Sequence, residues 1–377
     1  DADSALGSDM SSLNASLASS IYNYTYENGR RYHAYREGEY LFPNDESEQN
    51  RLDMLHHIFK LVLGGNLFKA PIKEPLQRVL DFGTGTGIWA IELADENPAT
   101  QVQGTDLSPI QPIWVPPNLK FVVDDCESSW PEEDHSNYDF VHGRSMSGSV
   151  ANWSALFTEA LQALKPGGWL EMQEFDVWFR SEEGELPADS KIAEWQSYLD
   201  QASLMFGKRL NVANEFKEKM IEVGFEDVRD DIIKVPIGAW PKNPRLKEQG
   251  RWLQAQMLDS IEPISLGYCS RILKWSDAKT QVFMAGVRNE FLNNKTHLFV
   301  YCHFIYGRRP GVQRDDESYY SHEGSTGVRV VFALIGVGNV LGTIKRIVCI
   351  SFQTYLSTLQ DREAQVSTSH LYLRLTP

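Results

Sequence analysis

The sequence predicts an α/β protein built on a mostly parallel sheet with helices on both faces. Between residues 78 and 175, short apolar stretches of strand length alternate with stretches of helical periodicity. A glycine-rich loop follows the first strand, and the turn Lys165-Pro-Gly-Gly168 separates the last helix from the next strand. Because βαβ units of this size pair their strands in parallel, consecutive repeats define the sheet.

We expect about seven strands in this sheet. Five belong to the repetitive part, and the last two lie on either side of a helical insertion at about 241–293. The stretch 296–306 is apolar at both alternating sets of positions, which predicts a strand buried on both faces. The expected strands are 78–82, 101–105, 119–123, 138–142, 169–175, 226–237 and 296–306.

Helices are expected wherever apolar residues recur at helical spacing. In the first of them Asp45 is the expected N-cap, and Gly64-Gly65 ends the helix. Another runs as one long helix near 190–223, closed by Gly224. The expected helices are 46–63, 88–95, 152–164, 190–223, 241–259 and 276–293.

Charge and composition exclude several functional classes. The chain has 377 residues, with 36 Lys and Arg against 51 Asp and Glu, a formal net charge of −15. An excess of acid disfavours direct binding to nucleic-acid phosphates but permits docking onto a basic protein partner. Four cysteines without a Cys-x-x-Cys pair indicate neither disulfides nor zinc. They fit a reducing compartment, so we expect a cytoplasmic or nuclear protein.

Four regions are expected along the chain. Residues 1–20 are polar, predicted to be mobile, and show no signal peptide. Residues 21–77 form an aromatic cap and a helix, and residues 78–310 form the sheet domain. The tail 311–377 has no assigned role. Its apolar stretch 328–352 is interrupted by polar residues, and no membrane span is expected.

The loop Gly83-Thr-Gly-Thr-Gly87 is the strongest chemical signal. Glycine permits positive φ angles and a close approach of a ligand to the backbone. The loop follows a strand and opens a helix, which is a ligand crevice in a parallel sheet. The dinucleotide fingerprint fails because its third glycine falls on Ile88, and the P-loop lysine is absent. Asp81 would repel a pyrophosphate and suits a cationic group, such as the ammonium of a methionine moiety.

Acidic residues also follow the next two strands. Asp106, at the end of the second strand, is placed to accept hydrogen bonds from ribose hydroxyls. Asp125, after the third strand, is placed to accept from an exocyclic amine, while Leu107 and Cys126 offer apolar contact to a purine. Each residue alone has an ordinary structural explanation, as an N-cap or a turn. Three in order at successive strand ends indicate a nucleoside cofactor.

These motifs resemble the class I S-adenosylmethionine-dependent methyltransferases over about residues 78–175. A narrower resemblance, to the fungal LaeA-like methyltransferases, extends to residues 306–310 and then stops. The motifs that carry it are NGRRYH (28–33), REGEY (36–40), PNDE (43–46), LDFGTGTGIW (80–89), DLSPIQP (106–112), WVPPN (114–118), LKPGGW (164–169) and YGRRP (306–310).

This resemblance implies a Rossmann-like methyltransferase sheet with S-adenosylmethionine as its cofactor. It places the cofactor's methionine end in the loop, the ribose on one strand-end acid and the adenine beyond it. Arg144, just after the fourth strand, would lie at the boundary between cofactor and substrate. The implied cofactor-binding residues are Asp81, Gly83, Thr84, Gly85, Gly87, Asp106, Leu107, Asp125, Cys126 and Arg144.

Methyl transfer from a sulfonium requires mainly alignment of the acceptor and exclusion of water. A general base is needed only for a poorly ionised hydroxyl or a protonated amine. His142 and Glu174, at the ends of the fourth and fifth strands, are the candidates, with His33 and His303 more distant. A structural role is the ordinary alternative for each, and His303 is expected to be a satisfied core residue. No metal site is expected, because His56 and His57 are adjacent and no His-Glu-x-x-His occurs.

The tyrosine-rich segment 22–42 has two interpretations. It could close over the cofactor as a lid, with ring faces that attract the sulfonium. Alternatively, Tyr22, Tyr24 and Tyr26 could pack as an added edge strand of the sheet.

Three functions are compatible with the sequence. The first is methyl transfer to a small-molecule acceptor in fungal secondary metabolism. The second is a LaeA-like nuclear regulator that acts through protein partners, and the third is a binding module without catalysis. The acceptor and its reacting atom cannot be identified from sequence, since the fold does not encode the substrate.

Overall fold

The computed structural model describes residues 24–27, 29–33, 36, 38, 40–293 and 295–311. The expectations for the N-terminal stretch 1–20, for Tyr22 and for the tail from residue 312 onward lie outside the described residues.

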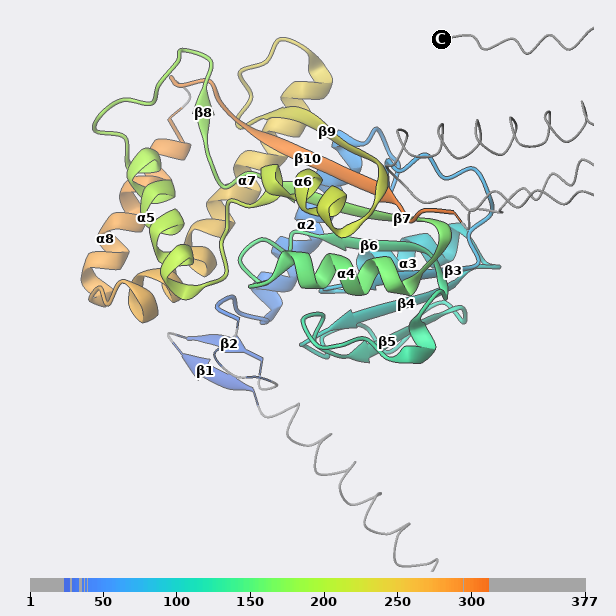
Figure 1. The fold of residues 1–377 in the computed structure, drawn as a ribbon. Coiled ribbons are helices and arrows are strands. Elements are labelled where there is room, and N and C mark those ends of the chain that lie inside the picture. Colours follow the sequence, from blue (N-terminus) through green and yellow to red (C-terminus); the bar gives the residue numbers. More distant parts are fainter. Residues whose placement is uncertain are drawn as a thin grey trace, which may run out of the picture. The chain divides into compact units, whose positions relative to one another are not determined.

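The predicted sheet is confirmed, with one short strand added. It has eight strands in the order β5-β4-β3-β6-β7-β10-β8, and β9 also pairs with β10 (Figure 1). The strands from β5 to β7 are parallel, whereas β10 is antiparallel to β7, β8 and β9. The strands are β3 (Arg78–Phe82), β4 (Gln101–Asp106), β5 (Leu119–Val123), β6 (Tyr138–Arg144), β7 (Leu164–Phe175), β8 (Arg180–Ser181), β9 (Glu226–Pro236) and β10 (Leu298–Arg308).

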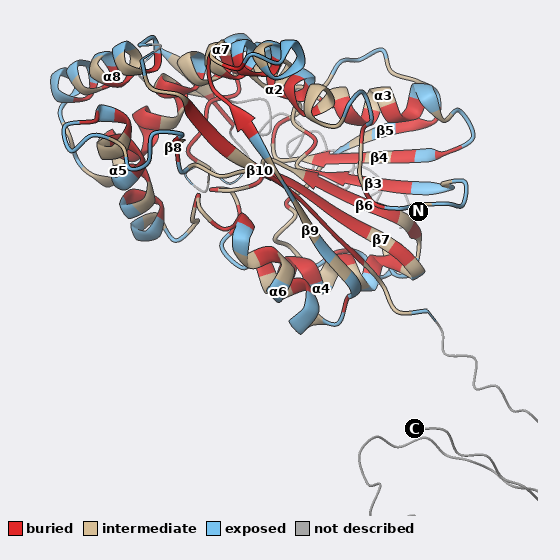
Figure 2. Ribbon diagram, turned by 90° about the horizontal axis from the view of Figure 1, so that it is seen from above, coloured by how far each residue is buried: buried red, intermediate tan, exposed pale blue. Residues whose placement is uncertain are grey.

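Helices cover both faces of this sheet. Figure 2 shows α2, α3 and α7 on one face and α4 and α6 on the other, with the central strands β3, β6, β7 and β10 buried along most of their length. The insertion before β10 contains α7, a π-helix and α8. The helices are α2 (Glu46–Val62), α3 (Ile88–Glu96), α4 (Trp153–Ala163), α5 (Lys191–Phe206), α6 (Ala213–Val223), α7 (Pro244–Leu266), the π-helix η2 (Gly267–Ile272) and α8 (Asp277–Phe291), with a short 3-10 turn η1 (Glu132–Asp134).

The first helix has the expected limits. The side chain of Asp45 accepts a hydrogen bond from the backbone N–H of Glu48, so Asp45 is the N-cap. The helix ends at Val62, and Gly64 and Gly65 follow with φ of 68° and 100°. Both glycines adopt the left-handed conformation that terminates helices.

The single long helix expected at 190–223 is wrong. Gly207 adopts φ of 88°, and its N–H donates to the carbonyls of Ser203 and Leu204, which ends α5. The chain then turns through five residues before α6 begins at Ala213. The apolar periodicity resumes after the turn and conceals the break, because a left-handed glycine interrupts the backbone without altering the hydrophobic pattern.

The tyrosine-rich segment does not add an edge strand to the large sheet. Its described part forms a separate hairpin of β1 (Thr25–Glu27) and β2 (Arg30–Tyr32), with Gly29 at φ of 75° in the turn. Arg30 fixes this hairpin to the N-cap of α2 through an ion pair of 2.6 Å with Asp45. The expectation of an edge strand is therefore wrong, because the two short strands pair with each other.

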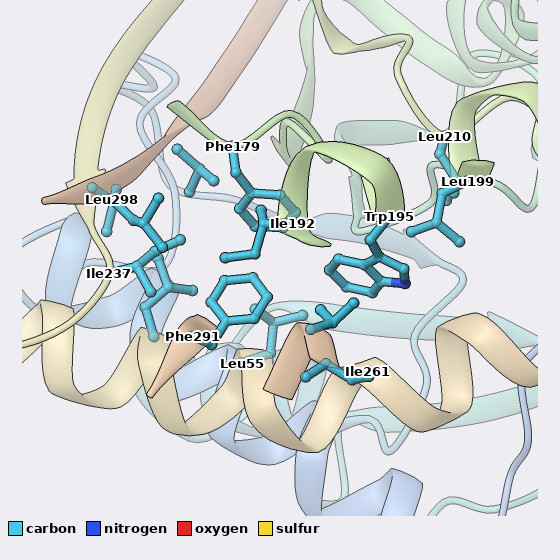
Figure 3. Close-up of a cluster of buried hydrophobic side chains, with 14 of the residues drawn as sticks. Leu55, Phe179, Ile192, Trp195, Leu199, Leu210, Ile237, Ile261, Phe291 and Leu298 are labelled. Atoms are coloured by element: carbon cyan, nitrogen blue, oxygen red, sulfur yellow. The ribbon is translucent and has the colours of Figure 1, made fainter. Parts of the chain in front are cut away.

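The largest apolar cluster lies beneath the insertion, between α2, α5, α7, α8 and β10. Figure 3 shows side chains from these elements converging, with Trp195 and Phe291 near the centre. The Trp195 ring stacks on Phe179 at 5.6 Å, and its indole N–H donates to the Ser265 hydroxyl at 2.8 Å. Trp195 therefore connects α5 to α7.

Replacing Trp195 by Ala should lower the free energy of unfolding by about 3–5 kcal/mol, because a large cavity and an unpaired Ser265 hydroxyl would remain. Urea unfolding followed by circular dichroism measures the change. W114A is the matched control: Trp114 is 93% exposed, so its loss should change stability by less than about 0.5 kcal/mol. Equal effects of the two substitutions would contradict this account of the core.

Candidate active site

The loop between β3 and α3 requires its glycines. Gly83, Gly85 and Gly87 have φ of 63°, 60° and 81°. A Cβ on Gly83 would lie 2.1 Å from the sulfur of Met146, and one on Gly87 would lie 2.3 Å from the ring of Phe121. The loop backbone is therefore exposed to the crevice in a conformation that other residues rarely adopt.

Asp81 lies at the end of β3 beneath this loop. It is only 3% exposed, and each of its carboxylate oxygens has a partner. One accepts from the His142 Nδ1 at 2.7 Å, and the other accepts from the Thr84 hydroxyl at 2.5 Å. The His142 ring stacks on Trp89 at 3.7 Å. Since burial lowers the pKa of His142, the imidazole is neutral at pH 7 and donates its Nδ1 proton to Asp81.

Asp106 joins the second strand to the same loop. Its carboxylate accepts from the backbone N–H of Gly85 at 2.8 Å and from that of Ser108 at 2.9 Å. Burial raises the pKa of Asp106 to about 6, although the backbone hydrogen bonds oppose this shift. The loop and two strand-end carboxylates therefore form one hydrogen-bonded unit.

A cleft of about 410 Å³, including its open mouth, lies above this unit. Helix α2 walls it on one side through Leu52 and Leu55. Arg144 also lines it, and its guanidinium lies over the Phe59 ring, 5.1 Å from the ring centroid. The lining residues are Leu52, Leu55, Asp81, Gly83, Thr84, Gly85, Thr86, Ile88, Trp89, Arg144 and Ser145.

The residues expected around adenine do not line this cleft. Asp125 is 7% exposed, and its carboxylate accepts from the N–H of Glu127 and forms an ion pair of 2.5 Å with Arg36 of the N-terminal segment. Cys126 packs at the edge of the apolar cluster beneath α4, and burial raises the pKa of its thiol. Leu107 directly follows β4 and is half-buried.

Neither candidate base lines the cleft. His142 is fully buried under Trp89 and is engaged with Asp81. Glu174 is 2% exposed and accepts from the backbone N–H of Met146 at 2.5 Å. Burial raises the pKa of Glu174 to about 7.

The two more distant histidines are also engaged. Burial alone would lower the pKa of His303, but Asp176 at 3.4 Å and Asp230 at 2.8 Å outweigh burial and raise it to about 9. His303 is therefore a charged and satisfied residue, as expected from its apolar strand. His33 is buried, with its Nε2 3.3 Å from the carbonyl of Arg36.

Sequence reasoning missed the wall that α2 contributes. Leu52 and Leu55 belong to the apolar stripe of that helix, and the stripe shows that the helix is amphipathic but not which surface it meets. The place of Trp89 in the cleft was also not predicted. Its position in the first turn of α3, directly after the glycine loop, is the signal that could have placed it in the cleft.

No group of three or more His, Cys, Asp or Glu residues that could hold a metal ion occurs within the described residues. Nor does that part of the chain contain a helix long and apolar enough to cross a bilayer.

Comparisons with known proteins identify the class. Residues 54–229 match a family model described as a methyltransferase domain. The chain is 41% identical over 303 residues to the methyltransferase pytC of Aspergillus terreus. The aligned residues cover 80% of this chain and 93% of that protein. It is 38% identical to the secondary metabolism regulator LAE1 of Cochliobolus heterostrophus, over 75% of this chain and 94% of that protein.

Two further likenesses are weaker. The chain is 33% identical to the protein-methionine methyltransferase laeA of Emericella nidulans, over 75% of this chain and 76% of that protein. Among solved structures, phosphoethanolamine N-methyltransferase 2 of Haemonchus contortus has a TM-score of 0.39 at 17% identity, over 79% of this chain and 73% of that one.

The class is therefore that of methyltransferases that use S-adenosylmethionine. Within this class the chain belongs to the fungal family that includes pytC and the LaeA-like regulators. The family predicted from the sequence motifs is confirmed.

Replacing Glu174 by Gln should change stability in a pH-dependent way. A carboxyl group whose folded pKa is about 7 stabilises the fold below the ordinary pKa of about 4.3, and this stabilisation is lost as the pH rises toward 7. Gln mimics the protonated acid and keeps an oxygen for Met146. We expect E174Q to equal wild type near pH 4.5 and to exceed it by up to about 3 kcal/mol at pH 8.

Urea unfolding at the two pH values measures this difference. The control E226Q replaces an exposed glutamate and should track wild type at both. A stability difference between E174Q and wild type that does not change with pH would contradict the assignment of a raised pKa to Glu174.

Proposed function

We propose that the cleft holds the methionine end of S-adenosylmethionine and that this chain transfers the methyl group to a small-molecule acceptor in secondary metabolism. The observation that carries the proposal is Asp81, a buried carboxylate fixed at the strand end beneath a loop of three left-handed glycines. A negative charge held there suits an ammonium group and opposes a phosphate chain.

The residues present fit this cofactor. The glycine loop leaves its backbone open, so a nucleoside can approach closely. Asp106 is half-buried and already oriented by two backbone N–H groups, which leaves lone pairs for ribose hydroxyls. Thr84 would fix Asp81, and Arg144 would border the methionine moiety. Asp125, Leu107 and Cys126 would surround the adenine once the Arg36 side chain gives up Asp125.

When bound, the cofactor supplies an activated methyl group on a sulfonium. The chain's own contribution is to orient the acceptor and to exclude water. Because neither His142 nor Glu174 lines the cleft, the preferred acceptor atom needs no proton removed at the moment of transfer. An ionised phenol, an enolate carbon or a neutral amine meets that condition.

Two alternatives receive support from the names of relatives. A thioether sulfur also carries no proton, and one relative is named a protein-methionine methyltransferase. A role in regulation through protein partners is supported by the relatives named secondary metabolism regulators. Both alternatives retain the same cofactor cleft. The first changes the acceptor, and the second replaces turnover by binding to a protein partner.

Replacing Asp81 by Asn should weaken the binding of S-adenosylhomocysteine by about 10- to 100-fold, since a charge-assisted hydrogen bond to the ammonium is lost. Calorimetric titration measures the affinity. D139N is the matched control: both carboxylate oxygens of Asp139 also accept hydrogen bonds, from the N–H groups of Gln77 and Arg78 and from Lys165 Nζ, but at the opposite end of the sheet. Equal losses in both variants would show that Asp81 acts only on the fold.

The acceptor is tested by untargeted metabolite profiling with an isotope-labelled methyl donor. Fungal extract incubated with the protein should gain a labelled small molecule that is missing with D81N. Label in protein methionine alone would instead support the protein-methionine alternative. Co-purification with a protein partner and no labelled product would support the regulatory one.

A further inference from the structure

Arg144 is half-buried and lacks the ion-pair partner that an arginine in such a place ordinarily has. It is the last residue of β6, and its side chain lines the cleft beside Asp81. Within the described residues its guanidinium forms neither an ion pair nor a side-chain hydrogen bond, and it lies over the Phe59 ring. A ring contact satisfies none of the five N–H donors of a guanidinium.

Arg51 shows the ordinary arrangement in the same region. Its side chain is 11% exposed, and its guanidinium donates to both carboxylate oxygens of Glu48, at 2.6 and 2.9 Å. A buried charge is tolerated when it is paired in this way, and it is costly when it is not. Arg144, half-buried and without an ion-pair partner among the described residues, therefore offers its N–H donors to an anion in the cleft.

The charge on Arg144 persists at neutral pH. Burial lowers the pKa of its guanidinium to about 10, while Asp81 opposes this shift. Asp81 is close enough to act electrostatically but is already bound to His142 and Thr84. The cleft thus presents one fixed anion and one fixed cation, each with capacity for a ligand.

An anion and a cation in one cleft are complementary to a zwitterion. The α-amino acid head of a methionine-derived nucleoside has a carboxylate and an ammonium on the same carbon. Arginine binds carboxylates through parallel N–H donors, which adds orientation to charge attraction. Phe59 supports the guanidinium from one side without occupying any donor.

We propose that Arg144 binds the carboxylate of the cofactor's amino acid head, opposite Asp81, so that the cleft selects nucleosides with a zwitterionic tail. This inference rests on the proposed function, because it assumes that S-adenosylmethionine occupies the cleft. It assigns to Arg144 a specificity role for the intact amino acid and not only a place at the boundary with the substrate.

Calorimetric titration of the full chain with three ligands separates the contribution of the ligand's carboxylate to binding from that of its ammonium. S-adenosylhomocysteine has both charges, its decarboxylated analogue keeps only the ammonium, and methylthioadenosine has neither. Wild type should bind S-adenosylhomocysteine about 10- to 100-fold more tightly than the decarboxylated analogue. In R144Q this gap should close, whereas affinity for the decarboxylated analogue should be kept or improve. R144K should restore part of the gap.

A second readout separates binding from folding. The thermal midpoint of ligand-free R144Q should equal or exceed that of wild type, because a half-buried charge without an ion-pair partner has been removed. The stabilisation produced by S-adenosylhomocysteine should shrink. R180Q is the matched control: Arg180 also lies over an aromatic ring, that of Tyr301, but it pairs with Asp176 outside the cleft. It should leave the selectivity among the three ligands unchanged.

The outcomes are distinguishable. A gap that persists in R144Q, or a wild type that binds both nucleosides equally, would overturn the role of Arg144 and leave the proposed function intact. A wild type that binds none of the three ligands would overturn the proposed function itself. If R144Q fails to fold, the selectivity of wild type and of R144K decides the matter.

Discussion

The fixed carboxylate of Asp81 is the constraint on which the rest of the site depends. A buried acid at the end of a parallel strand survives as an anion only if its oxygens are satisfied. His142 satisfies one oxygen from the neighbouring strand, and Thr84 satisfies the other from within the loop. The loop must therefore turn back over the strand, which three left-handed glycines allow. This arrangement places a negative charge where nucleotide-binding folds of similar topology receive phosphate.

Strand pairing places further buried polar residues beside the contact between Asp81 and His142, in a direction away from the cleft. Asp81 pairs with His142 on the next strand, and His142 pairs with Glu171 on the one after it. Glu171 accepts from the backbone N–H groups of Lys69 and Ala70, in the linker that follows α2. Burial raises the pKa of Glu171 to about 7. Asp81, His142 and Glu171 therefore form a row of buried polar residues that leads from the glycine loop to the linker that follows α2.

The linker that follows α2 makes a second set of hydrogen bonds at Leu67. Its carbonyl accepts from the indole N–H of Trp89 and from the side-chain amide of Gln173, both at 2.9 Å. Both donors come from elements of the sheet domain. The segment after the helix that walls the cleft is therefore held by α3 and β7, while the charged residues inside the cleft lie on β3 and β6. Parts of the chain that are distant in sequence thus meet around the cleft.

Local sequence could predict the elements of the sheet because their signals are local. The loop residues Gly83 to Gly87 and the acid Asp106 each follow a strand, and topology alone brings strand ends together. The break at Gly207 was missed because the apolar periodicity continues beyond it. The pairing of Asp125 with Arg36 could not be foreseen, since the two residues are 89 positions apart and the contact depends on how the N-terminal segment folds back. The unpaired state of Arg144 is likewise visible only once its surroundings are known.

The central claim is that a strand-end carboxylate makes this crevice selective for a cationic nucleoside. Equilibrium titration of the wild-type chain with S-adenosylmethionine, S-adenosylhomocysteine, NAD and ATP tests it most directly. The account predicts saturable binding of the first two and none of the phosphate-bearing pair at the same concentrations. Saturation by NAD or ATP, with both adenosyl compounds ignored, would contradict it.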